Sequence, residues 1–323
     1  LIHQSNVTGI INPIKEIIKK AHSYDALVLI DAAQSISHHK INVKSLDCDF
    51  LVFSGHKTYA PGSPGVVIAK KSFLSAVEPD EVGGGMVDRV FPDNYYVTKQ
   101  FPDREEAGTP NILGAITLGA AIHVLGHIGM DTVLKEDMEL TNYAIDKMIN
   151  IQDVVIYGEN CTTKCPRAGT ISFNIKSMDH GLVAAVLNDY FNIAVRNECF
   201  CAHPYVEKML EMTHDSQIKE AKERLSQSPW HIEPWMGMVR ASFGIYNTTK
   251  DVNNFIIKVN FKNPIIVGHS WGGMVALSYG AKYTYCIKGL CLIDGGTTEI
   301  SSSHASPGLV VTPSLTSVSY THL

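Results

Sequence analysis

The stretch ALVLIDAAQ at residues 26–34, followed by FLVFSGHK at residues 50–57, decides the fold. Each stretch begins as an apolar run of strand length and ends in polar groups. Near-continuous apolar runs of this kind are typical of parallel strands that are covered on both faces. Ligands of open α/β sheets lie beyond the carboxyl ends of the strands. We therefore expect Asp31 and Lys57, which follow these two runs, to face a ligand.

The segments around the two strands alternate between helix and strand patterns. Pro13 suits the first position of a helix. Ile14, Ile17 and Ile18 then recur on one face, which predicts a helix over residues 12–23. Strand patterns occur at residues 26–30, 50–53 and 65–69. This order predicts an α/β fold, a doubly wound domain with a parallel-type sheet.

Later parts of the chain are more varied. Residues 112–125 are dense in Ala, Ile and Leu and predict a buried helix, and a more polar helix is expected over about 131–150. The next segment reads as α+β, with strands at 170–175, 193–196 and 238–244 and a helix at 181–190. We expect four parts: a large domain over 1–150, a smaller α+β domain over 151–259, a separate unit over 263–296, and a disordered or non-native Ser/Thr-rich tail over 297–323.

The composition is that of an ordinary globular protein. Of 323 residues, 45% are hydrophobic and 18% are charged, which is enough apolar mass for a large core. The net charge of -5 and the lack of a long charged block argue against nucleic acid or a membrane surface as a partner. No apolar run approaches the roughly 18 residues of a membrane span. Seven scattered cysteines do not suggest a disulfide framework, so we expect a reducing, cytoplasmic setting.

The acid and the lysine at neighbouring strand ends indicate a cofactor. Pyridoxal 5'-phosphate (PLP) is held by a lysine as an imine, and a buried carboxylate keeps its ring nitrogen protonated. Lys57 and Asp31 suit these two roles. Gln34 could donate a hydrogen bond to the ring oxygen, and Ser54 and His56 could hold phosphate oxygens. Each residue alone has an ordinary interpretation as a cap or a solvated loop residue, but together they favour the cofactor.

Further motifs extend this pattern along the chain. They are Ser5-Asn6-Val7 with Gly9, Asn12-Pro13, Asp31 to Gln34, Asp47 to Lys57, Glu106 to Asn111, Ala194-Val195-Arg196, Cys201-Ala202, Val239 to Phe243 and Tyr246-Asn247-Thr248. With these motifs, residues 1–259 resemble the class V aminotransferase family, nearest to its cysteine desulfurase and selenocysteine lyase branch. The resemblance implies a PLP-dependent transferase fold of fold-type I and a small amino acid as substrate.

The resemblance also implies roles for cofactor-binding residues. Lys57 would be the Schiff-base lysine, with Asp31 at the ring nitrogen. Asn6 and Gln34 would contact the ring-oxygen side. Thr109 would reach the phosphate bound by the partner subunit of a homodimer.

Other residues would act on the substrate. Arg196 and Arg240 would bind it, and the planar guanidinium of Arg240 would grip its carboxylate with two donors. Cys201 sits five residues after Arg196, where desulfurases carry the cysteine that accepts sulfur as a persulfide and passes it to an acceptor protein. A reactive thiol needs a lowered pKa, which Arg196 and His203 would help to produce. The alternative for Cys201 is a loop thiol without chemistry.

Two features depart from the family pattern. The residue that stacks on the ring and the upstream phosphate turn should precede Leu1, so we expect an N-terminally truncated chain. The loop after Arg196 has residues 197–200 as NECF, where the family usually has glycine and histidine. A class V transaminase or another lyase therefore stays open as an alternative. Cys199, Cys201 and His203 lack a fourth ligand, so we expect no structural zinc.

A second signal is the sequence GHSWG at residues 268–272. It has the form G-x-S-x-G of a nucleophile elbow, with an apolar strand before it and a helix pattern over 274–283 after it. The unit over 263–296 resembles the α/β-hydrolase family, and Ser270 would be its nucleophile. A serine hydrolase is thus a rival function, although the strands for an oxyanion hole are missing upstream. Two partial families joined without a linker also suggest a chimeric, non-functional fragment.

Overall fold

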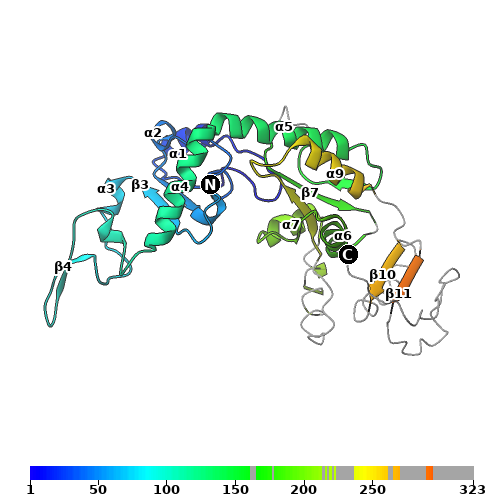
Figure 1. Ribbon diagram of the computed structural model, residues 1–323. Helices are drawn as coiled ribbons and strands as arrows, with labels where there is room; N and C mark the ends of the chain where they lie inside the picture. The colour runs from blue at the N-terminus through cyan, green and yellow to red at the C-terminus, as the bar shows by residue number, and fades with distance from the viewer. Residues whose placement is uncertain are drawn as a thin grey trace.

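The computed structural model describes residues 1–160, 165–176, 178–212, 215–216, 218–219, 222 and 236–260, together with the backbone of residues 265–269 and 289–293. Within them, an N-terminal region with a three-stranded sheet and a later region with a four-stranded sheet are joined by the long helix α5 (Met130–Met148) (Figure 1).

The N-terminal sheet has the order β1-β2-β3. Strands β1 (Leu29–Asp31) and β2 (Phe50–Ser54) are parallel, whereas β3 (Gly65–Ala69) runs antiparallel to β2. The sheet is therefore mixed, and the prediction of a parallel-type sheet is wrong for β3. The reason is the short connection from residue 55 to residue 64, because a parallel crossover needs about a dozen residues or more.

Helix α1 (Ile14–His22) lies within the predicted range, and it buries Ile14 and Ile18 against this sheet. Helix α2 (Val43–Leu46) is capped by Asn42, whose Oδ1 accepts a hydrogen bond from Ser45 N at 3.0 Å. The core of the region is formed by Ile14, Ile18, Val28, Ile30, Ala32, Cys48, Leu51, Phe53, Ala60 and Leu118. The elements after β3 are α3 (Lys71–Leu74), the hairpin β4 (Val87–Val90) and β5 (Tyr95–Val97), and the turn η2 (Asp103–Glu105).

Helix α4 (Ile112–Ile128) has the predicted position but not the predicted burial. Only Gly114, Leu118 and Leu125 are buried, while Leu113 is 80% exposed. The expectation of a buried helix is wrong. An apolar composition allows a helix to be buried but does not supply a partner for each of its faces, and the described residues pack against one face of α4 only. No single helix among the described residues meets the length and hydropathy of a membrane span, and α4 and α5 meet them only as a pair bent by 77°.

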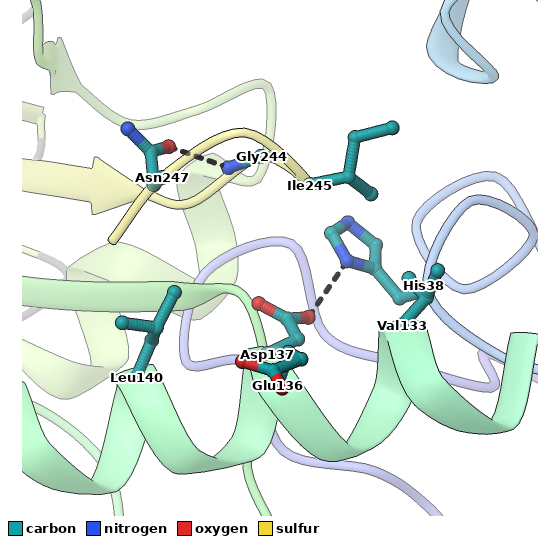
Figure 2. Close-up of a pocket in the computed structure, with 8 residues that line it drawn as sticks. All are labelled: His38, Val133, Glu136, Asp137, Leu140, Gly244, Ile245 and Asn247. Carbon is teal, nitrogen blue, oxygen red and sulfur yellow. Dashed lines mark hydrogen bonds and ion pairs between the residues drawn. The ribbon is translucent and has the colours of Figure 1, made fainter. Parts of the chain in front are cut away.

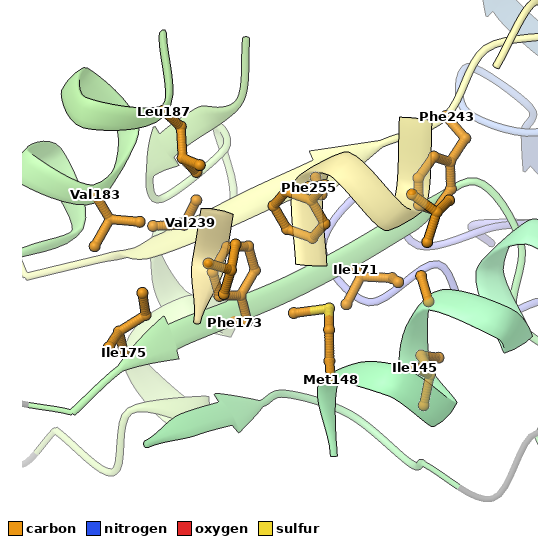
Figure 3. Close-up of a cluster of buried hydrophobic side chains, with 14 of the residues drawn as sticks. Ile145, Met148, Ile171, Phe173, Ile175, Val183, Leu187, Val239, Phe243 and Phe255 are labelled. Carbon is orange, nitrogen blue, oxygen red and sulfur yellow. The ribbon is translucent and has the colours of Figure 1, made fainter. Parts of the chain in front are cut away.

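The later sheet has the order β6-β7-β9-β8 and is antiparallel throughout. Its strands are β6 (Val154–Ile156), β7 (Thr170–Ile175), β8 (Arg196–Glu198) and β9 (Met238–Ser242). Helices α5, α6 (His180–Phe191) and α9 (Thr249–Val259) share one buried cluster with β7 and β9, so they cover the same face (Figure 3). In its centre the rings of Phe173 and Phe255 meet edge to face with centroids 5.6 Å apart. Helix α7 (His203–Met209) follows β8.

The predicted strand over 170–175 is confirmed by β7, while the strand expected at 193–196 begins at Arg196. Strands β10 (Ile265–His269) and β11 (Gly289–Ile293) pair in parallel over five residues, as two strands around a crossover would. The predicted helix over 274–283, Ser270 and the tail over 297–323 lie outside the described residues. The domain boundaries stay predictions.

Candidate active site

Four of the predicted cofactor residues lie at one edge of the N-terminal sheet. Asp31 is the last residue of β1 and stands opposite Val52 of β2. Ser54 ends β2, and the turn η1 (Gly55–Lys57) continues from it with His56 and Lys57. Because β1 and β2 are parallel, their carboxyl ends meet at the same edge, which is where the sequence predicted a ligand.

The turn at this edge is tightly built. Gly55 N donates to Pro64 O at 2.9 Å, and the Thr58 hydroxyl donates to Gly55 O. A Cβ on Gly55 would lie 2.5 Å from Ser63 Oγ and 2.6 Å from Pro64 O, so only glycine fits. The turn therefore holds the backbone of Lys57, while the side chain of Lys57 is exposed.

The polar side chains at the edge differ in their surroundings. Asp31 is half-buried and accepts a hydrogen bond from Ala33 N at 2.9 Å. Gln34 is half-buried in the turn after β1. His56 and Lys57 are exposed, and within the described part of the chain neither has a hydrogen bond or an ion pair. Among the described residues no group competes with a ligand for the Lys57 amine, and its role as the Schiff-base lysine stays a prediction.

A second group of predicted residues meets on the other sheet. Arg196 of β8 stands opposite Arg240 of β9, and Arg196 Nη2 donates to Cys201 Sγ at 3.2 Å. Arg240 Nη1 donates to Asn6 O at 2.9 Å. The guanidinium of Arg240 also lies 5.1 Å from the centre of the Phe200 ring.

Burial and, to a lesser degree, the charge of Arg196 lower the pKa of Arg240 to about 10. Arg240 is therefore still cationic at neutral pH. Its buried Nε has no hydrogen-bond partner among the described residues. A buried donor without an acceptor is costly, and a carboxylate is the acceptor that suits a guanidinium best.

A residue that the sequence patterns did not indicate joins the segment after Lys57 to the loop after β9. Tyr59 lies two residues after Lys57, and its hydroxyl accepts a hydrogen bond from Ile245 N at 3.0 Å. Its ring meets that of Tyr246 edge to face at 6.5 Å. Tyr59 has a φ of 59°, unusual for a bulky residue, so the contact comes with backbone strain beside the lysine.

Thr109 stands apart from both groups, exposed in the loop before α4. Ser270 lies outside the described residues. Among the described residues, no group of three or more His, Cys, Asp and Glu side chains is placed to hold a metal ion.

A cavity of about 160 Å³ lies between α5 and the loop after β9 (Figure 2). Its wall includes His38, whose Nδ1 is 2.7 Å from Asp137 Oδ2. Gly169 makes room for this pair, because a Cβ there would lie 2.9 Å from Asp137 Oδ2. Of the predicted site residues that the structure describes, none lines the cavity. The pair joins residues almost 100 positions apart, and no short motif signals it.

Comparison with known proteins identifies the family. The model of the aminotransferase class-V family matches residues 1–255, so the chain belongs to that family. A model of the alpha/beta hydrolase fold also matches residues 220–314. Both resemblances predicted from the sequence are thereby confirmed, although the second is partial.

The chain is similar to cysteine desulfurases in particular. It is 41% identical over 254 residues to a probable cysteine desulfurase of Halalkalibacterium halodurans, covering 78% of this chain and 55% of that protein. It is 37% identical over 252 residues to a cysteine desulfurase of Enterobacter sp. strain 638, with the same coverage of both chains. The chain therefore spans a little over half the length of these relatives.

Solved structures give the same result. The apo cysteine desulfurase of Thermococcus onnurineus superposes with a TM-score of 0.69 at 34% identity, over 80% of this chain and 58% of that one. The cysteine desulfurase CsdA of Escherichia coli gives 0.67 at 30% identity, over 80% and 57%. These structures are of fold-type I and have mixed sheets, and the N-terminal sheet of this chain is likewise mixed, because β3 runs antiparallel to β2.

Proposed function

We propose that this chain is a PLP-dependent class V enzyme of the cysteine desulfurase type, which converts L-cysteine to L-alanine and holds the sulfur on Cys201 as a persulfide. The observation that carries the proposal is that Arg196 contacts Cys201 and stands opposite Arg240 on the later sheet. The exposed thiol accepts a hydrogen bond from Arg196, and Arg240 beside it has a buried Nε for which the described residues offer no acceptor. A thiol, and a guanidinium whose Nε has no acceptor among the described residues, suit the sulfur and the carboxylate of cysteine.

The residues at the β1–β2 edge fit PLP. Lys57 offers an amine that no described residue binds, Asp31 offers a half-buried carboxylate, and Ser54 and His56 offer polar side chains just before and within the turn that carries Lys57. When bound, the cofactor would supply a sink for the electrons released at the substrate Cα. Lys57 would hold and return the Cα proton, Asp31 would keep the ring nitrogen protonated, and Gln34 would donate to the ring oxygen.

In the proposed sulfur step, the sulfur of cysteine passes to the thiol of Cys201. The thiolate of Cys201 attacks the sulfur of cysteine, a sulfur–sulfur bond forms, and the carbon–sulfur bond breaks. Cβ of the former cysteine takes up a proton. One enzyme thiol and one cysteine thus give one enzyme persulfide and one alanine, without any further oxidant or reductant.

Two protein partners belong to the proposal. A homodimer would bring the exposed Thr109 to the phosphate bound by the partner subunit. An acceptor protein would take the sulfur from Cys201, whose exposed position on its loop is suited to transfer. The expected setting is the cytoplasm, where free thiols persist.

The test begins with cofactor binding. Purified chain mixed with PLP should show the visible absorption of a lysine-bound cofactor, and Lys57→Ala should lose it. L-Cysteine is then added with a reductant, and alanine and sulfide are measured. Cys201→Ala should lower alanine formation by about a hundredfold or more. Cys165→Ala, which removes another accessible thiol, is the matched control and should keep full activity.

Each alternative has its own outcome. Full alanine and sulfide formation in Cys201→Ala would exclude the persulfide role. Keto-acid formation from other amino acids without sulfide release would indicate a transaminase. Labelling of Ser270 by an active-serine probe, with no absorption from PLP, would favour the hydrolase.

A further inference from the structure

The loop that carries Cys201 has a backbone conformation that it would not keep by itself. Glu198, Phe200 and Cys201 have φ values of 76°, 52° and 61°. These lie in the left-handed region, which residues with a Cβ seldom adopt. A segment with three such residues in four persists only where its surroundings hold it in place.

Phe200 is the anchor of this loop. Its side chain is 1% exposed, and the Arg240 guanidinium lies above its ring. The cluster around Phe200 consists of Val7, Cys199, Val206 and Met238. Burial fixes the ring, but the position of the thiol depends on the backbone that follows it.

That backbone is held by Asn6. Asn6 Nδ2 donates to Phe200 O at 2.9 Å, and Asn6 O accepts from Arg240 Nη1 at 2.9 Å. Asn6 thus contacts both the peptide group that precedes Cys201 and the arginine proposed to bind the substrate carboxylate. Arg196 also contacts the thiol, but it is an exposed side chain and restrains only the sulfur.

We propose that Asn6 is a positioning residue that ties the Cys201 loop to the cofactor. A side-chain amide has two N–H donors. One is used by Phe200 O, and no described residue accepts the other. The inference rests on the proposed function, in which Asn6 contacts the ring-oxygen side of PLP. The second N–H is the donor available for that contact, so one side chain sets the place of the thiol relative to the ring.

The first experiment needs neither cofactor nor substrate. Asn6→Asp keeps the shape of the side chain and removes both donors. Asn12→Asp is the matched control, since Asn12 Nδ2 donates to Ile2 O at 2.8 Å in the same kind of contact. Hydrogen exchange of the amides of residues 198–202 is measured by mass spectrometry. Asn6→Asp should raise their exchange about fivefold or more, while Asn12→Asp should leave it unchanged.

Unchanged exchange of residues 198–202 in Asn6→Asp would overturn the proposal. An equal rise across β7 and β9 would also overturn it, because it would mean that the whole sheet is destabilised. Far-UV circular dichroism of the two variants separates these cases.

The second experiment uses the PLP-loaded chain. Here the variant is Asn6→Ala, which removes both donors without placing a carboxylate beside Arg240. Loss of the loop position should lower kcat for alanine formation about tenfold and leave KM for cysteine within about twofold, because the Arg240 side chain and its contact with the backbone oxygen of residue 6 are kept. A rise in KM with unchanged kcat would overturn the positioning role. If wild-type chain fails to bind PLP, the proposed function fails and the cofactor contact of Asn6 fails with it. The exchange result then still decides whether Asn6 holds the loop.

Discussion

Acidification should destabilise this protein through one buried histidine. The His39 side chain is buried, and its Nε2 lies 2.8 Å from Gln4 Oε1. Because Gln4 Nε2 donates to Ala168 O at 2.7 Å, Gln4 Oε1 is an acceptor and His39 Nε2 carries the proton. Burial first, and then the nearby His3 and His38, lower the pKa of His39 from 6.5 to about 3.

The direction of the pH effect on stability follows from the difference in proton binding at His39 between the folded and the unfolded chain. An unfolded chain binds a proton at this side chain near pH 6.5, whereas the folded chain does so only near pH 3. Between these values the unfolded state binds more protons, so the stabilisation is complete above about pH 6.5 and is lost as the pH falls below it. At pH 5 the loss reaches about 2 kcal/mol, from 1.5 pH units at 1.36 kcal/mol each. Burial also lowers the pKa of His3, which adds loss in the same direction.

Urea unfolding followed by far-UV circular dichroism at pH 7.5 and pH 5.0 measures this loss. His39→Gln keeps an amide donor for Gln4 and cannot titrate, so it should remove about 2 kcal/mol of the pH-dependent change. Equal pH dependence of the wild type and His39→Gln would refute the reasoning. A wild-type free energy of unfolding that does not fall between the two pH values would refute it as well.

Four further substitutions test the packing and the charges. Phe173→Ala empties the centre of the later core and should lower the free energy of unfolding by about 3–5 kcal/mol in the same assay. Gly9→Ala should abolish folding, because φ is 72° and a Cβ would lie 2.5 Å from Thr170 O. Gly62→Ala, with φ 78° and open space, should cost only about 1–2 kcal/mol. Burial alone would raise the pKa of Asp49, but hydrogen bonds from a backbone amide, a lysine and a histidine hold it at about 2. Asp49→Asn should therefore cost about 2 kcal/mol at pH 7, and the difference from wild type should shrink as the pH falls from 4 towards 2.

Much of the edge site could be predicted without a structure. An apolar run of strand length that ends in a polar residue is a local pattern, because strand burial and side-chain alternation act over a few neighbouring residues. That pattern put Asp31 and Lys57 at two strand ends, and the parallel pairing of β1 and β2 agrees with it. Whether the amine and the carboxylate reach one ring stays a prediction.

Other features had no local signal. The direction of β3 depends on the short connection after β2, and the exposure of α4 depends on whether a partner face is present. The contacts of Asn6 with Phe200, Tyr59 with Ile245 and His38 with Asp137 join residues between 99 and 194 positions apart. The residue types at these positions, taken alone, predict only helix caps, loop residues and solvated side chains.

The sequence by itself thus determined the family, the strand ends and the residue types that carry the proposed chemistry, because these follow from local periodicity and from short motifs. Only the tertiary structure decided which of these residues share a site. Contacts between distant segments form where packing brings their backbones together, and Asn6 meets the Cys201 loop for that reason alone.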